Sequence, residues 1–147
     1  MVAIDPSTTQ VGTENAGYRI VCPPRGRALH VEGWGYWTPE LAQAFGRDVT
    51  AACRTVLSPL GFVFDATRLK PQGREGQEAL RSLLGCLARL ELSGATVGTT
   101  NILAKMQLVR LAKECGVESR LQIRDQTLDA ELARERAGRG ESSAWPK

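Results

Sequence analysis

This sequence contains little of what metal-dependent and nucleophilic sites require. It has a single histidine, His30, and its four cysteines form no CxxC pair. Zinc sites use paired Cys or His ligands at short spacing, so we expect no metal site, and no other cofactor is indicated. The cysteines, Cys22, Cys53, Cys86 and Cys115, lie in apolar stretches and are predicted to be structural thiols.

Strong charge and long hydrophobic runs are also missing. The net charge is only +3, because 19 basic and 16 acidic residues are interspersed along the chain. A nucleic-acid-binding protein would concentrate Lys and Arg in one stripe, so this class is not favoured. No apolar run approaches the length of a membrane span, and the N-terminus has no basic start followed by a hydrophobic segment. We therefore expect a cytoplasmic protein without a membrane span.

Motifs for phosphate binding or catalysis are absent as well. Gly33, Gly35, Gly73 and Gly76 assemble neither a P-loop nor a GxGxxG dinucleotide motif. His30 belongs to an alternating stretch that turns its side chain away from the core, and no nucleophile or acid accompanies it in sequence. The protein is therefore not expected to be an enzyme.

What is present is an alternation of strand and helix patterns. Two β-prone runs, 18–22 and 27–33, flank a Pro/Gly turn and predict a hairpin. The motif Thr38-Pro39-Glu40 predicts a helix start, and a leucine-bearing helix and a third helix closed by Gly116 follow later. Strands are predicted at 61–66, 95–99 and 120–124, and a last helix is predicted to open at Thr127 and Asp129. The order β-β-α-β-α-β-α-β-α predicts an α/β fold with a mostly parallel sheet and helices packed against it.

The composition at the two ends sets the predicted domain limits. Residues 1–16 are polar and without pattern, which is typical of a flexible arm, and residues 138–147 are typical of a disordered tail. A single domain is predicted between them, over residues 17–137.

A loop joins a predicted strand to a helix in the segment FVFDATRLKPQGREGQEAL, residues 62–80. This segment, the order of elements, and the closing stretch VRLAKECGVESRLQIRDQTLDAELA resemble the STAS domain of bacterial anti-sigma-factor antagonists. The resemblance covers Tyr18 to Ala137. It implies a non-catalytic signalling module in transcription regulation, whose partner is a kinase-like anti-sigma factor or another STAS protein; a homodimer is a further option.

The family's phosphorylation motif is degenerate in this chain. In the family, an Asp at the strand end is followed by a later serine that directly precedes a glycine and is phosphorylated by the partner kinase. When the family's motif is aligned with this sequence, the resemblance implies partner-binding residues at Asp65, Thr67, Arg74, Glu75 and Gly76. Glu75 occupies the position of the phosphoserine, so the hydroxyl needed for the switch is missing. Glu75 either supplies a permanent negative charge to the partner surface or serves only as an acid in the first helical turn.

The stretch GWGYW, residues 33–37, concentrates three large rings before the first helix. Trp34, Tyr36 and Trp37 either form an interface or fold back on the helix as a staple. Exposed rings would also suit a pocket, which gives an alternative function: a carrier or sensor of a small hydrophobic ligand.

Overall fold

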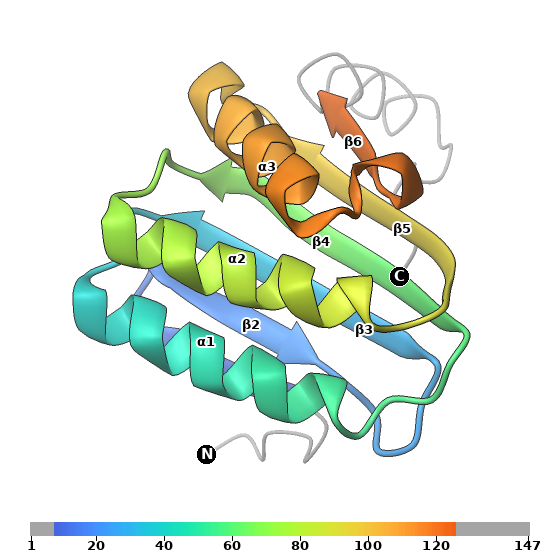
Figure 1. Ribbon diagram of the computed structural model, residues 1–147. Coiled ribbons are helices and arrows are strands. Elements are labelled where there is room, and N and C mark those ends of the chain that lie inside the picture. The colour runs from blue at the N-terminus through green and yellow to red at the C-terminus, as the bar shows by residue number, and fades with distance from the viewer. Residues whose placement is uncertain (1–7, 126–147) are drawn as a thin grey trace, which may run out of the picture.

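The computed structural model describes residues 8–125, which form one α/β domain with a six-stranded sheet and three α-helices (Figure 1). The strands are β1 (Thr8–Gly12), β2 (Gly17–Val21), β3 (Ala28–Gly35), β4 (Leu60–Leu69), β5 (Leu92–Thr99) and β6 (Gln122–Asp125). The helices are α1 (Pro39–Cys53), α2 (Arg74–Ala88) and α3 (Ile102–Cys115), and a 3-10 turn, η1, covers Glu118–Arg120. The predicted α/β class with a mostly parallel sheet is thus confirmed.

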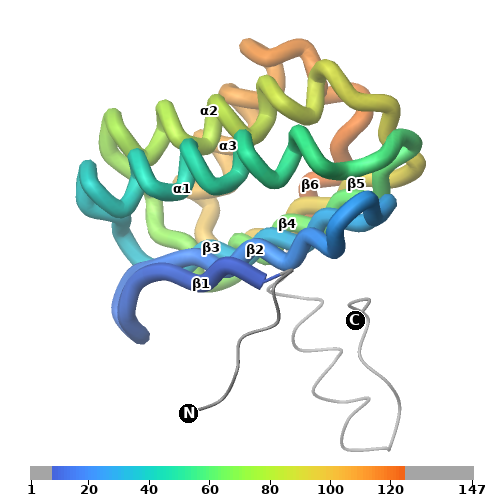
Figure 2. The backbone as a smooth tube through the Cα atoms, turned by 90° about the horizontal axis from the view of Figure 1, so that it is seen from below, coloured from blue at the N-terminus to red at the C-terminus, as the bar shows by residue number. Residues whose placement is uncertain are grey.

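The strands lie in the sheet in the same order as in the sequence. β1, β2 and β3 pair antiparallel, whereas β3, β4, β5 and β6 pair parallel. Each parallel connection moves the chain one strand in the same direction, and right-handed crossovers then place every connecting helix on the same face. Figure 2 shows this helical layer on one side of the sheet. We call the other side, which no helix of residues 8–125 covers, the open face.

The helix ends follow the local signals of the sequence. Thr38 caps α1 by accepting a hydrogen bond from the Leu41 N–H at 3.2 Å, with Pro39 in the first turn. Asn101 caps α3 in the same way, and Gly116 closes that helix in the left-handed conformation with φ 75°. These ends orient the helices so that their apolar faces meet the sheet.

The core lies between the helical layer and the inner face of the sheet. Alternate residues of β4 point into it, and α2 covers them with a leucine-rich face. The central side chains are Leu60, Phe62, Phe64, Ala66, Leu80, Leu83, Leu84 and Leu87. Because this packing holds β4 and α2 together, it also fixes the loop between them.

Two sequence predictions differ from the structure, and two fall outside the described residues. Thr8–Gly12 forms strand β1 within the predicted flexible arm, because it pairs antiparallel with β2. The strand predicted over 61–66 continues to Leu69, because Arg68 and Leu69 pair with Trp34 and Gly35 of β3. The predicted last helix and the tail lie outside the described residues.

Candidate functional site

The candidate site lies where the parallel strands end and the following helices begin. We call this edge the carboxyl rim; it comprises Tyr36 after β3, the loop Lys70–Gly73 after β4, the first turn of α2, and the first two turns of α3. In α/β sheets, ligands and partners gather at this edge.

The buried side chain of Gln72 holds the loop Lys70–Gly73 in place. Its Nε2 donates hydrogen bonds to the carbonyl oxygens of Gly35 at 2.9 Å and Lys70 at 2.8 Å. Its Oε1 accepts a hydrogen bond from the Trp37 backbone N–H at 3.0 Å. A single amide therefore ties the loop after β4 to the chain after β3.

Two further glutamines extend this network to the helices. The Gln72 backbone N–H donates to Oε1 of Gln107 at 2.8 Å, and Nε2 of Gln107 donates back to the Gln72 carbonyl at 3.0 Å. Nε2 of Gln77 donates to the same carbonyl at 2.9 Å. The loop is thus held to both α2 and α3. No sequence pattern marks this network, because a buried glutamine in a loop looks like any polar loop residue.

The start of α2 depends on two glycines. Gly73 is its N-cap residue and provides no side-chain cap; a Cβ at this position would overlap the Tyr36 hydroxyl. Gly76 packs directly over Gln72, and a Cβ there would lie 2.5 Å from Gln72 Oε1. Since any larger residue would displace a neighbour, the predicted partner-binding residue Gly76 has a packing role.

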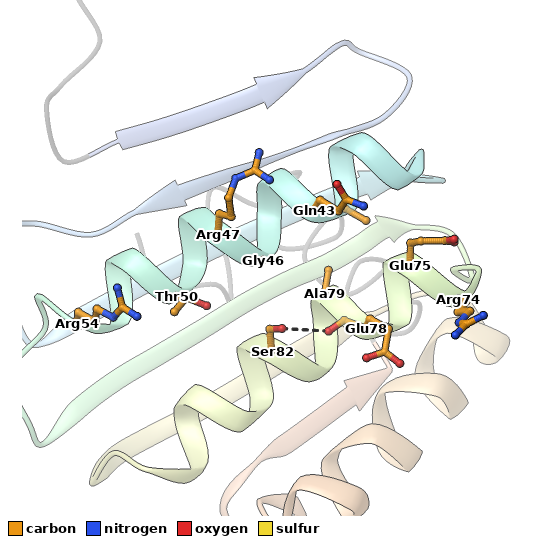
Figure 3. Close-up of a pocket in the computed structure, with 11 residues that line it drawn as sticks. Gln43, Gly46, Arg47, Thr50, Arg54, Arg74, Glu75, Glu78, Ala79 and Ser82 are labelled. Carbon is orange, nitrogen blue, oxygen red and sulfur yellow. Dashed lines mark hydrogen bonds between the residues drawn. The ribbon is translucent and has the colours of Figure 1, made fainter.

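Arg74 and Glu75 are exposed on the first turn of α2 and point to different sides. Glu75 lies on the side of α2 that faces α1, whereas Arg74 lies on the side of α3 (Figure 3). Both line a groove of about 800 Å³ between α1 and α2. We call it the α1–α2 groove; the other residues that line it are Ala42, Gln43, Gly46, Arg47, Thr50, Arg54, Glu78, Ala79 and Ser82.

The α1–α2 groove is lined by charges of both signs. Arg47 of α1 and Arg54 directly after α1 line one wall, and Glu75, Glu78 and Arg74 of α2 line the other. Gly46 has no side chain, so it leaves space at the base of the groove. This arrangement suits a polar peptide or helix of a partner better than an apolar small molecule.

The structure separates the five predicted partner-binding residues into two groups. Asp65 and Thr67 lie within β4 and point to the open face, away from Arg74, Glu75 and Gly76 on α2. The Asp65 carboxylate accepts hydrogen bonds from the Thr67 N–H at 3.0 Å and the Thr67 hydroxyl at 2.6 Å. The expectation that Asp65 ends the strand at the loop is therefore wrong, and these two residues form a local turn-like pair on the sheet.

Trp37 is buried, so it does not form the exposed interface that was one of the two alternatives for this ring. It is 2% exposed, packs against Tyr18 and Phe45, and donates a hydrogen bond from Nε1 to the Gly17 carbonyl at 2.9 Å. Gly33 makes room for the ring, because a Cβ there would come within 2.9 Å of it. The ring is part of the core.

Trp34 is likewise buried, although it lies on the open-face side of β3. It is 7% exposed, and its Nε1 donates a hydrogen bond to the Thr13 carbonyl at 2.7 Å. The Arg68 guanidinium lies over the ring, 5.6 Å from its centroid, in a cation–π contact. Of the three predicted aromatics, only Tyr36 is available to a partner, at 55% exposure. The predicted aromatic pocket is therefore not formed by these rings.

Metal-ligating side chains do not form a cluster within residues 8–125. No cluster of three or more His, Cys, Asp or Glu side chains suitable for a metal occurs there, and no helix there is both long and apolar enough to cross a bilayer. His30 is half-buried on the open face, as its alternation predicts. The four cysteines are free, and burial next to Cys86 raises the pKa of the Cys53 thiol to about 12, which keeps it protonated at neutral pH.

Comparison with known proteins leaves the chain without an assigned relative. No family model matches it, and no curated protein or solved structure gives a significant match.

Proposed function

We propose that this protein is a non-catalytic, cytoplasmic interaction module of the STAS type, which binds a regulatory protein through the start of α2. The observation that carries the proposal is an exposed charged pair, Arg74 and Glu75, on a helix start that Gln72 holds in place. A fixed surface loses little conformational entropy when it binds, so it favours recognition. The regulator is a kinase-like anti-sigma factor or another STAS protein, as the sequence resemblance implies.

Phosphorylation of serine does not control this surface in the proposed function. Residues 73–76 read Gly-Arg-Glu-Gly and contain no hydroxyl group. Glu75 carries one permanent negative charge where a phosphoserine would carry about −1.5 to −2. Because Glu75 faces the arginine-bearing wall of the α1–α2 groove, a partner that enters the groove meets both signs of charge.

The alternative function, a carrier of a small hydrophobic ligand, has lost its predicted pocket. Trp34 and Trp37 are buried in packed surroundings and do not surround a cavity together with Tyr36. The α1–α2 groove is lined largely by charged and polar side chains, which do not suit an apolar ligand.

A pull-down from native cytoplasm tests the proposal. Wild-type protein and the double variant Arg74→Ser/Glu75→Ser are used as bait, and bound proteins are quantified by mass spectrometry. We expect a regulator that is recovered in different amounts with the two baits. A matched control is Glu91→Ser, since Glu91 is an exposed acid before β5, at the opposite edge of the sheet. Equal recovery with all three baits would contradict the proposal.

A further inference from the structure

Three large apolar side chains protrude from the start of α3. Ile102, Leu103 and Met106 are 63%, 58% and 60% exposed, although α3 buries Ala104 and Leu108 against the rest of the domain. Isolated exposed apolar residues are ordinary, but three within two helical turns form a contiguous patch. We call these three residues the α3 patch.

Basic residues lie on the same rim as the α3 patch. Lys105 lies between Leu103 and Met106 in the sequence, and α3 contains no acidic residue before Glu114. Lys70 is exposed at the end of β4, which neighbours β5, the strand that leads into α3.

Arg74 adds a third cation on this side of the rim. Its side chain extends toward α3, although the residue also lines the α1–α2 groove, whereas the neighbouring acid, Glu75, lies toward α1 (Figure 3). None of the ion pairs among residues 8–125 includes Lys70, Arg74 or Lys105. The side of the rim next to α3 is therefore both apolar and positively charged.

This combination favours an anionic lipid surface over a protein partner. A second copy placed patch to patch would bring like charges together. A peptide or helix is usually received in a groove, and the groove at this edge lies between α1 and α2 instead. Protruding aliphatic side chains with flanking lysines need no complementary groove on a bilayer, because the apolar groups enter the acyl boundary while the cations meet headgroup phosphates.

We propose that the α3 patch inserts into the surface of an anionic membrane, with Lys70, Arg74 and Lys105 contacting the lipid headgroups. Tyr36, exposed on the same rim, would lie at the level of the headgroups, where amphipathic rings are favoured. This peripheral attachment shares Arg74 with the partner-binding surface proposed above, whereas Glu75 and the arginines on the α1 side of the groove take no part in it.

Co-sedimentation of the full chain with lipid vesicles tests this proposal. The wild type should bind vesicles that contain phosphatidylglycerol and should bind pure phosphatidylcholine vesicles much more weakly. The variant Ile102→Gln/Leu103→Gln/Met106→Gln should bind at least tenfold more weakly, because its side chains no longer favour the acyl boundary. Each of Lys70→Glu and Lys105→Glu should weaken binding at least about fivefold, and more strongly at low salt.

Matched controls separate the patch from general effects. Leu57→Gln removes an exposed apolar residue after α1, and Arg89→Glu removes a cation after α2; both positions lie at the opposite edge of the sheet. Both controls should bind vesicles like the wild type, and Glu75→Gln should not reduce binding. Failure of the wild type to bind anionic vesicles, or full binding by the triple variant, would overturn the proposal. So would a dimer in solution that the triple variant abolishes, because a second copy would then cover the patch.

Discussion

Replacement of Gln72 by alanine should destabilise the protein by about 2–5 kcal/mol, although Gln72 is a polar loop residue. The side chain makes three hydrogen bonds, to the carbonyls of Gly35 and Lys70 and from the Trp37 N–H. Truncation leaves the buried Trp37 N–H without its acceptor, at a cost of about 1–3 kcal/mol. Each lost bond to a carbonyl adds about 0.5–1.5 kcal/mol. The Gly35 carbonyl keeps a second partner, the Lys70 N–H at 3.2 Å, so its contribution lies at the low end.

Urea unfolding monitored by tryptophan fluorescence measures this change directly, because Trp37 is buried next to the altered site. Gln77→Ala is the matched control: Gln77 is only partly buried, and its side chain donates one hydrogen bond to the Gln72 carbonyl of the same loop and accepts an exposed one from Arg110. We expect the control to lose no more than about 1.5 kcal/mol. If Gln72→Ala unfolds within about 0.5 kcal/mol of the wild type, the loop is not held by this side chain.

Two further predictions concern stability. Gly76→Ala should lower the free energy of unfolding by about 1–3 kcal/mol, because the new Cβ would meet Gln72. A Cβ at Gly85, in the same helix, would have no neighbour within 4 Å, so Gly85→Ala should instead raise the free energy of unfolding by about 0.5–1 kcal/mol. Equal urea midpoints for the two variants would contradict both predictions. Burial and the hydrogen bond that Tyr18 donates to Asp48 at 2.6 Å raise the pKa of Tyr18 above its ordinary value near 10. The unfolded chain therefore loses this proton first, so the contribution of Tyr18 to stability should be full below about pH 10 and fall above it. Tyr18→Phe should remove that part of the alkaline loss in a pH series of urea unfolding; an unchanged alkaline slope would contradict the assignment.

The order of elements could be predicted because its signals are local. Thr38 and Gly116 mark helix ends by their own chemistry, and the apolar spacing of α2 follows from its contact with the sheet. Strand β1 was missed because it is an edge strand of mostly polar residues, whose structure depends on pairing with β2 rather than on an apolar pattern.

The candidate site was harder to predict because it depends on contacts distant in sequence. Asp65 resembles a strand-ending residue, but the open face allows a polar side chain in mid-strand. The burial of Trp34 and Trp37 depends on glycines opposite them: Gly17 is the cross-strand partner of Trp34, and Gly33 leaves space for Trp37. The space that these glycines leave for the rings cannot be inferred before the strand register is known.

The central claim is that Glu75, at the start of α2, is part of a surface that recognises a regulatory protein. The measurement that tests it most directly is the affinity of a regulator captured with the wild type for Glu75→Arg, with Glu91→Arg as the control at the opposite edge. We predict that the wild type and the control bind alike, whereas Glu75→Arg, with its fold intact by circular dichroism, binds with a clearly altered dissociation constant. Equal affinity of all three proteins would remove Glu75 and the start of α2 from the recognition surface.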